Sequence, residues 1–508
     1  MPGRLEFAVG FKKNKGQPEK EEDEDGRGPF RILVCADFGG NRSGAAAGGS
    51  ARPPSPIRVD IDNLAEVFTR LAPRVSITLG AAAAPTEGVL GSLDDFHPDG
   101  LCRIVEPLHA LCEARRRLLD PRTHAEMVAA FAQASAVGEA AATPAVPTAP
   151  ESGELAEKDD DTMARLLGRG PREPAAVGAS ASRHASAVDD IIRRAVAPHV
   201  APESDPRQSR YVASLEEVLT SHLREILHEP GFQRLEATWR GLHWLVSTLG
   251  PDEELELYVL DASKEELASQ VAGGAALADT PLGRRVRDAG PWSLLLGDYT
   301  FTSAAADLAL VAGLGGLGRA VGASFLCGAD GSLAGGRTSG SGTDVSDWIP
   351  LDAEAAARWR AARRNADASF VGLLWPRLLL RLPYGAKTDP IETFPFEEVT
   401  TLLSHDAFLW GNGAFAGGGL IGLAFRENGP DMEPGDVREL GDLPLFTYAE
   451  AGEKKMLPCA ECWINERALD AVIAQGIMPL VSARDRNAVR LPRTQSIADP
   501  PAPLSGFE

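Results

Sequence analysis

The stretch Phe30-Arg-Ile-Leu-Val-Cys-Ala36 decides the fold class. Its uninterrupted apolar run after Arg31 is typical of a strand that is buried on both faces, as in sheets covered by helices. A loop rich in Gly, Ser and Ala follows, and the chain becomes extended again at residues 57–59. We therefore expect this region to open an α/β unit.

Helical patterns follow this first strand. Asp60 or Asp62 can cap a helix that Pro73 ends. The predicted buried face of this helix carries Ile61, Leu64, Phe68 and Leu71. After a strand at residues 75–79, a second helical pattern spans residues 99–119, and Pro107 predicts a kink or a break in it.

Strand and helix patterns also intermingle after residue 210. Two helical patterns, at residues 212–227 and 232–249, are separated by Pro230-Gly231. Strand-like or apolar runs follow at 255–260, 293–296 and 370–382, and a glycine-rich stretch spans 411–425. This mixture predicts an α/β or mixed α+β fold.

Composition divides the chain into four parts. Residues 1–28 hold an alternating strand and an acidic tether, so this strand arm must pair elsewhere; its apolar face carries Leu5, Phe7, Val9 and Phe11. Residues 29–132 and 210–508 are the two globular segments. The intervening residues 133–209 are rich in Ala, Pro, Gly, Ser and Thr, which predicts a flexible linker. A short amphipathic helix is expected there near 187–197, with Val188, Ile191, Ile192 and Val196 on its apolar side.

The overall charge argues against several classes of function. The 508 residues include 51 basic and 72 acidic side chains, a formal charge of -21, which repels nucleic acid and anionic membranes. No run of 18 apolar residues occurs, and the first residues lack the apolar core of a signal peptide. We expect a cytoplasmic protein that binds no nucleic acid and does not insert into a membrane.

Catalytic and metal-binding motifs are weak. Cys459 and Cys462 have metal or redox spacing but no second pair, so structural thiols are favoured for the six cysteines. The sequence holds no P-loop, His-Glu-x-x-His or Gly-x-Ser-x-Gly motif, so we expect no catalytic residue, no cofactor and no metal. The acid pairs Asp94-Asp95 and Glu397-Glu398 are interpreted as solvated caps.

One motif supports an alternative function. Gly313-Leu-Gly-Gly-Leu-Gly318 has the G-x-G-x-x-G spacing of a dinucleotide site, with Asp330 downstream. The surrounding sequence is rich in Gly and Ala and lacks a full βαβαβ series. A nucleotide-binding enzyme therefore stays as the alternative to a structural protein.

Several stretches resemble the two contractile sheath proteins of type VI secretion systems, TssB (VipA) and TssC (VipB). The likeness to the small subunit, TssB, lies in residues 30–39, 57–63, 71–74, 94–98 and 115–121. The likeness to the large subunit, TssC, lies in residues 226–230, 235–243, 263–267, 296–299, 375–377, 381–389, 409–412 and 495–496. These stretches include residues that we interpret as structural: Asp37, Asp60, Asp62, Trp239, Arg240, Gly241, Asp298, Arg381, Tyr384, Gly385, Trp410, Gly411 and Asn412.

The resemblance implies a fold that the two segments form jointly, as one fused sheath protomer with a mechanical role. Implied partners are other copies or separate TssB and TssC subunits, the Hcp inner tube, and baseplate or cap proteins. The ATPase ClpV would recognise the helix near 187–197. Extended arms lace neighbouring protomers in this family, which suits the strand arm.

The resemblance also implies a second possibility. The family's large subunit continues beyond the region that matches the end of this sequence, and that further region takes part in the lacing. An end piece, adaptor or regulator that does not polymerise alone is therefore the alternative within the family. Attachment to a membrane-anchored baseplate is also implied.

Overall fold

The computed structural model describes residues 28–40, 54–79, 85–131, 206–335, 345–399, 404–450 and 452–507. The predicted strand arm at 5–11 and the predicted docking helix at 187–197 lie outside these residues. Strands and helices are mixed throughout, which confirms the predicted mixed α/β class.

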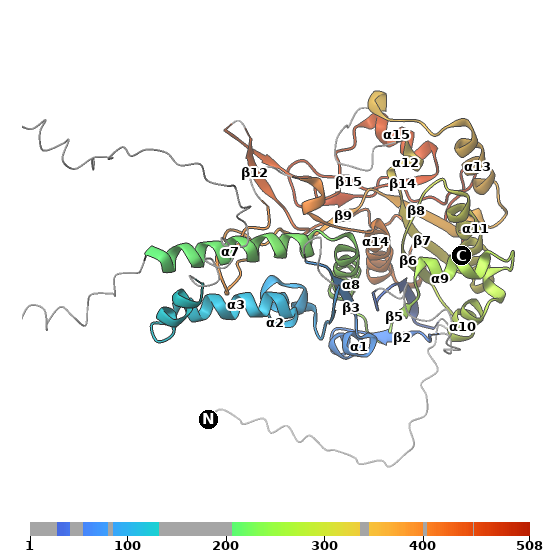
Figure 1. Ribbon diagram of the computed structural model, residues 1–508. Coiled ribbons are helices and arrows are strands. Elements are labelled where there is room, and N and C mark those ends of the chain that lie inside the picture. The colour runs from blue at the N-terminus through green and yellow to red at the C-terminus, as the bar shows by residue number, and fades with distance from the viewer. Residues whose placement is uncertain are drawn as a thin grey trace, which may run out of the picture. The chain divides into compact units, whose positions relative to one another are not determined.

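A seven-stranded sheet forms the centre of the part of the chain described, in the order β14-β8-β7-β6-β1-β5-β2 (Figure 1). Its strands are β1 (Phe30–Ala36), β2 (Ile57–Val59), β5 (Leu255–Asp261), β6 (Leu294–Phe301), β7 (Ser324–Ala329), β8 (Val371–Trp375) and β14 (Ile477–Pro479). All neighbouring pairs are parallel except β2 with β5, which is antiparallel.

The strand quoted first, β1, is an inner strand of this sheet. It pairs with β5 from Phe30↔Leu255 to Ala36↔Asp261, and with β6 from Ile32↔Leu294 to Cys35↔Gly297. Both neighbours lie more than 200 residues away in sequence. In Figure 1 the blue β1 and β2 accordingly belong to the same sheet as the green and yellow strands. Residues from the two segments therefore share one sheet.

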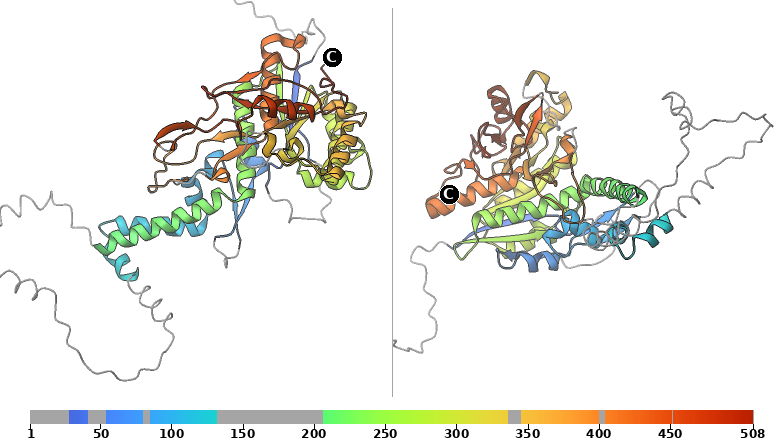
Figure 2. Two further views of the ribbon diagram at one scale, coloured as in Figure 1. Left: turned by 90° about the horizontal axis from the view of Figure 1, so that it is seen from above. Right: turned by 90° about the vertical axis from the view of Figure 1, so that its left-hand side faces the viewer.

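Helices cover both faces of the sheet (Figures 1 and 2). On β6, β7 and β8, one set of alternate side chains joins a cluster with α9 (Lys264–Val271), α10 (Pro281–Ala289), α11 (Ala305–Val321) and α13 (Ala353–Arg363). The intervening leucines contact α14 (Gly413–Asn428), which packs beside α8 (Pro230–Leu249). Because successive strand residues point to opposite faces, the two sets of helices lie on opposite faces.

Glycines allow α14 to approach the sheet closely. A Cβ on Gly418 would lie 2.4 Å from Cδ1 of Leu296, and one on Gly417 would lie 2.9 Å from Cδ2 of Leu374. Side chains of the sheet occupy the space that larger residues would need, so the glycines of this helix serve close packing.

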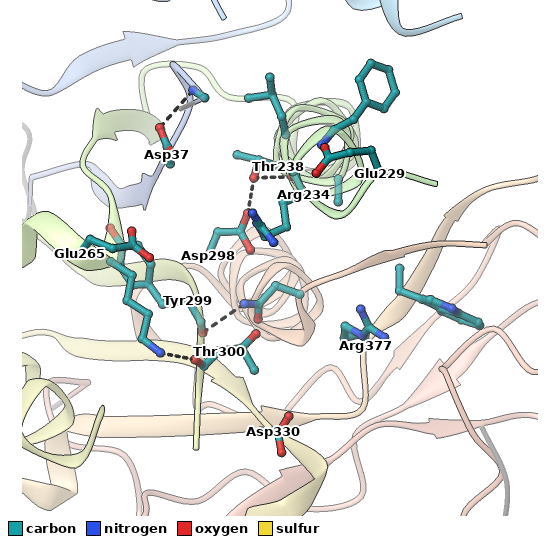
Figure 3. Close-up of a pocket in the computed structure, with 18 of the residues that line it drawn as sticks. Asp37, Glu229, Arg234, Thr238, Glu265, Asp298, Tyr299, Thr300, Asp330 and Arg377 are labelled. Atoms are coloured by element: carbon teal, nitrogen blue, oxygen red, sulfur yellow. Dashed lines mark hydrogen bonds between the residues drawn. The ribbon is translucent and has the colours of Figure 1, made fainter. Parts of the chain in front are cut away.

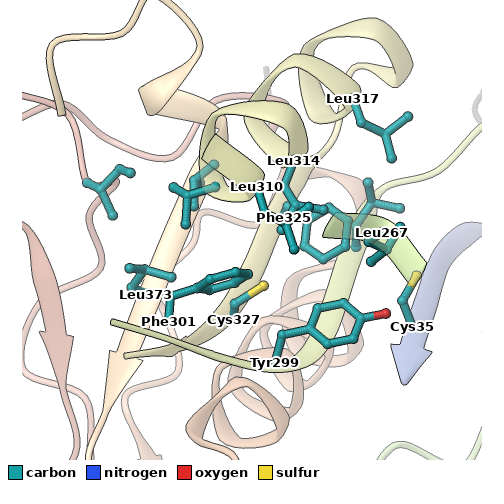
Figure 4. Packing of buried hydrophobic residues seen from close by; sticks show 14 of the residues in the cluster. Cys35, Leu267, Tyr299, Phe301, Leu310, Leu314, Leu317, Phe325, Cys327 and Leu373 are labelled. Atoms are coloured by element: carbon teal, nitrogen blue, oxygen red, sulfur yellow. The ribbon is translucent and has the colours of Figure 1, made fainter. Parts of the chain in front are cut away.

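The core between the sheet and α9–α11 holds a tyrosine and two buried cysteines (Figure 4). The Tyr299 hydroxyl donates to the carbonyl oxygen of Ala262 at 2.7 Å, which satisfies the polar end of the ring. Burial raises the pKa of the Cys35 thiol to about 12 and raises the pKa of Cys327 well above its usual value. Both groups therefore act as small apolar side chains.

The first helix begins later than the sequence suggested. Asn63 is the N-cap of α1 (Leu64–Leu71), and Asp60 Oδ1 accepts from the backbone N–H groups of Asp62 and Asn63 at 3.0 and 2.9 Å. Ile61 is 59% exposed, so its assignment to the buried face was wrong, because it precedes the helix. The break predicted at Pro107 is confirmed, since α2 (Pro98–Ile104) ends before α3 (Glu106–Leu119) begins.

Smaller elements complete the described residues. Two-stranded sheets join β3 (Arg74–Ile77) with β4 (Thr86–Val89), β9 (Leu378–Arg381) with β10 (Leu409–Gly411), and β12 (Thr447–Glu450) with β13 (Glu453–Met456). A three-stranded sheet joins β11 (Glu439–Leu440), β16 (Val489–Arg490) and β15 (Val481–Ser482). Three further α-helices are α7 (Pro206–Leu227), α12 (Gly331–Ala334) and α15 (Glu466–Ala474).

The chain forms two compact units. The first contains the sheet and combines residues up to 109 with those from 220 onward. The described residues of the second unit are 110–131 and 206–219, where Leu118, Val128 and Leu215 are buried together. Within this second unit, an ion pair joins Arg115 Nη2 to Glu216 Oε1 at 2.7 Å, so residues from both sides of the predicted linker meet here too.

Candidate functional site

The first candidate site is the contact between residues 30–109 and residues 220–507 inside the first unit, which we call the segment seam. Its centre is β1, which lies between β5 and β6. Strands of the large segment therefore flank a strand of the small segment on both sides.

Several aromatic side chains pack together at the seam, beyond the end of β1. The indole Nε1 of Trp239 donates to the carbonyl oxygen of Phe38 at 3.0 Å, and Trp239 is 1% exposed. The rings of Phe68 and Phe38 lie 4.4 and 5.1 Å from the Trp239 ring, and Phe96 packs on Phe232 at 5.6 Å. Trp239, Trp375, Tyr384 and Trp410, aromatic residues of the most family-like stretches, are all buried.

Two aspartates hold backbone groups across the seam. Asp261 Oδ1, at the end of β5, accepts from the N–H groups of Phe38 and Gly39 at 3.0 and 3.3 Å. Asp99 of α2 accepts from the N–H groups of Glu392 and Thr393 at 2.8 and 3.1 Å. Burial alone would raise the pKa of Asp99, but these hydrogen bonds lower it. Sequence reasoning missed both roles, because each partner is distant in the chain.

A buried ionic network lies beside the seam. Arg381 is 8% exposed and contacts Glu236 Oε1 through Nε and Glu398 Oε2 through Nη1, both at 2.7 Å. The interpretation of Glu397-Glu398 as a solvated cap was therefore wrong for Glu398, which is 2% exposed. Burial would raise the pKa of Glu398, but Arg381 lowers it.

The other family-like residues support this network and α14. Arg240 Nη2 donates to the hydroxyl of Tyr384 at 2.9 Å, and a Cβ on Gly385 would lie 2.2 Å from a carboxylate oxygen of Glu397. Asn412 is the N-cap of α14: its Oδ1 accepts from the N–H of Ala414 at 2.9 Å. Steric limits apply to two further glycines, since a Cβ on Gly241 would meet Phe415 and one on Gly411 would meet Leu380.

The second candidate site is a crevice of about 800 Å³ where β1, β6, β7 and β8 end (Figure 3). This edge of a parallel sheet is the usual place for a ligand. Its polar lining includes Asp37, Arg234, Asp298, Asp330 and Arg377. The crevice is therefore a candidate site for ligand binding or catalysis.

The crevice's charged groups make structural contacts. Asp37 Oδ1 accepts from the N–H of Gly40 at 3.0 Å, and Asp330 caps α12. Burial raises the pKa of Asp298, which accepts a hydrogen bond from Thr238 Oγ1 at 2.5 Å. Glu461 would also have a raised pKa from burial, but hydrogen bonds from Arg377 and His405 lower it to about 2. These contacts account for the positions of Asp37, Asp298, Asp330 and Glu461.

The dinucleotide motif does not form a dinucleotide site. Gly313 to Gly318 lie inside α11, which begins at Ala305, whereas the fingerprint requires a turn between a strand and a helix N-terminus. A Cβ on Gly315 would lie 2.7 Å from the carbonyl oxygen of Asp367. The alternative of a nucleotide site at these glycines was wrong, because their spacing serves the close packing of a helix.

Cys459 and Cys462 are thiols, as are the other four cysteines. Burial raises the pKa of Cys459 to about 11 and that of Cys462 to about 12, which opposes formation of the thiolate that redox or metal chemistry needs. Among the residues with described positions, no group of three or more His, Cys, Asp or Glu side chains could hold a metal ion.

Known protein families match both of the segments that meet at the seam. Residues 209–498 match VipB (EvpB), the tail sheath N-terminal domain, and this match covers more than half of the chain. The chain belongs to the VipB tail sheath family. Residues 17–136 match VipA of type VI secretion systems. The VipA match therefore supplies β1 and β2, and the VipB match supplies the rest of the central sheet.

A curated relative agrees with this assignment. The type VI secretion system sheath protein TssC1 of Pseudomonas aeruginosa is 31% identical over 308 residues, which cover 57% of this VipB-family chain and 61% of the relative. The chain thus spans about six tenths of the relative's length. Within the described ranges, no helix has the length and apolar character needed to span a membrane.

Proposed function

We propose that this VipB-family chain is a structural component of a type VI contractile sheath or a related assembly, in which its VipA-like and VipB-like segments form one protomer. The observation that carries the proposal is the inner position of β1 between β5 and β6. Removal of an inner strand would expose apolar surface on both neighbours, so neither segment would be stable alone.

The proposed role is mechanical. The seam carries aromatic packing and backbone clamps that join the two segments, and a buried ionic network within the large segment lies beside it. The proposed partners are further copies of this chain, separate TssB and TssC subunits, the Hcp tube, baseplate or cap proteins and the ATPase ClpV. The proposed location is the bacterial cytoplasm, with attachment to a membrane-anchored baseplate.

Electron microscopy of the purified full chain, alone and with the sheath and tube proteins of the same organism, tests the proposal. Ordered helical tubes, or specific incorporation into tubes formed by the other subunits, are the expected result. Association with those subunits without tube formation would support the adaptor alternative. No association with any sheath or tube protein would refute the proposed function.

A deletion tests the strand arm, which remains a prediction. Removal of residues 1–13 should abolish association while leaving the melting temperature of the chain unchanged, because the arm is proposed to pair with a neighbour. A second variant replaces Leu5, Phe7, Val9 and Phe11 by serine. It removes the apolar face of the arm but keeps the length of the chain. Unaltered assembly in both variants would contradict the role of the arm.

A further inference from the structure

One buried carboxylate of the large segment contacts two arginines of the small segment. Glu256 of β5 is 8% exposed. Its Oε2 lies 2.7 Å from Nε of Arg31 on β1, and its Oε1 lies 3.3 Å from Nη1 of Arg58 on β2. Because β1 and β2 flank β5 on either side, both strands added by residues 30–59 contribute one arginine each to the same carboxylate.

The three side chains share one face of the sheet. Arg31 is opposite Glu256 in the β1–β5 register, and Arg58 is opposite Tyr258 in the β2–β5 register. Residues 256 and 258 point to the same face, so Arg58 is the diagonal neighbour of Glu256. The Tyr258 hydroxyl also donates to Glu256 Oε2 at 3.0 Å. Each carboxylate oxygen thus has a cationic partner only when its arginine is in place, Arg31 for Oε2 and Arg58 for Oε1.

The apolar part of β1 cannot define this register by itself. Ile32 to Ala36 are buried on both faces, so a shift by two residues would keep every side chain on its original face and in an apolar environment. Such a shift would place Leu33 or Pro29 opposite Glu256 in place of Arg31. With Leu33 opposite, Glu256 would keep only Arg58 as a cationic partner, and removal of one partner from a buried ion pair is unfavourable.

We propose that Glu256 selects the partner at the segment seam: it accepts a β1–β2 pair that brings an arginine to each side of β5, and it rejects strands that do not. The inference rests on the proposed function, in which the two segments form one protomer. An assembly of many copies presents many competing small segments, and a buried charge that penalises a wrong strand provides specificity. The partner recognised is therefore an arginine-bearing strand pair, from the same chain or from a second copy.

Exchange between cleaved chains tests the proposal. A specific protease site is inserted between residues 150 and 151 of the full chain, the chain is cleaved, and exchange of the N-terminal piece with a fluorescently labelled cleaved preparation is followed. Glu256→Arg should accelerate this exchange by about a hundredfold, because it opposes two arginines with a third. The charge-swapped triple variant Glu256→Arg, Arg31→Glu, Arg58→Glu should return to within about tenfold of the wild-type rate.

The matched control is Glu253→Arg, an exposed glutamate just before β5, which should leave exchange unchanged. Equal rates for Glu256→Arg and Glu253→Arg, or no recovery in the charge-swapped triple variant, would overturn the proposal.

A milder competition covers the possibility that Glu256→Arg does not fold. Wild-type cleaved chain is offered equal amounts of wild-type and Arg31→Gln, Arg58→Gln N-terminal pieces from cleaved full chains. We expect the wild-type receiving chain to take up the wild-type piece at least about thirtyfold more than the variant piece. With Glu256→Gln in the receiving chain, this preference should fall below about threefold. Equal uptake by the wild-type chain would overturn the proposal. Because exchange needs no assembled sheath, selective exchange without association in electron microscopy would refute only the proposed function.

Discussion

Replacement of Arg381 by methionine is the sharpest test of the buried network. All five N–H groups of the guanidinium are used: they donate to Glu236, Glu398 and the carbonyl oxygen of Leu382 at 2.7–3.2 Å. The guanidinium carbon also lies 4.1 Å from the centre of the Tyr384 ring. Methionine fills much of the volume but supplies no donor, so the change isolates the charge.

The magnitude follows from burial. Glu236 and Glu398 are 0% and 2% exposed, so Arg381→Met leaves two carboxylates in a site that water reaches poorly. Removal of one partner from a buried ion pair costs about 3–5 kcal/mol of the free energy of unfolding. Arg240 still contacts Glu236 at 2.7 Å, and the backbone N–H of Tyr384 still donates to Glu398 at 2.8 Å, so we expect a loss near the lower end of that range.

The pH dependence of the variant should reverse in sign. In the wild type, Arg381 lowers the pKa of Glu398, so this group's contribution to stability is present above its unfolded pKa and is lost on acidification. Without Arg381, we expect burial to outweigh the remaining interactions with His228 and the Tyr384 backbone and to raise the pKa of Glu398, so that the folded state binds a proton more readily than the unfolded state. The free energy of unfolding of Arg381→Met should therefore rise as the pH falls from 8 toward 5.

Urea unfolding followed by tryptophan fluorescence at several pH values provides the assay. Arg319→Met is the matched control, because the Arg319 side chain is 66% exposed and its ion pair with Asp367 at 2.7 Å should contribute about 0–1 kcal/mol. The reasoning fails if Arg381→Met loses no more stability than Arg319→Met, or if its stability falls on acidification as in the wild type.

Three further predictions concern packing and acid stability. Gly241→Ala should lower the free energy of unfolding by about 1–3 kcal/mol, because its Cβ would lie 2.6 Å from the Phe415 ring. The control Gly316→Ala in α11 should not destabilise the protein. Equal effects of the two changes in urea titrations would contradict this prediction. Trp239→Ala should cost about 3–5 kcal/mol by the same assay, and unchanged stability with lost assembly would instead indicate an interface role. Glu461, whose pKa is lowered to about 2, stabilises the fold above its unfolded value of 4.5, and this contribution should disappear between pH 4.5 and 2; an identical acid transition in Glu461→Gln would disprove it.

Local patterns in the sequence predicted many elements well. The apolar run at 30–36, the extended residues 57–59 and the helix break at Pro107 all appear in the structure, because each depends on the chemistry of neighbouring residues. The likeness to sheath proteins also came from sequence alone and is confirmed by the matches to VipA and VipB.

Local patterns failed where one residue type has several structural uses. The spacing of Gly313 to Gly318 suits both a phosphate-binding turn and a closely packed helix, and only the position inside α11 distinguishes them. Glu398 has the local sequence of a solvated acid, yet it is buried against Arg381. A charged residue within the buried face of a helix, as at Glu236, was the available signal for such a network.

Partner choice within the sheet was decided only by the tertiary structure. The sequence by itself determined that Phe30–Ala36 is a strand, because an apolar run buried on both faces is recognisable without its neighbours. It could not determine that β1 lies between β5 and β6, because those neighbours are more than 200 residues away and offer apolar strands of similar composition. The contacts that distinguish one arrangement from another, such as Glu256 with Arg31 and Arg58, form only when distant strands are brought side by side.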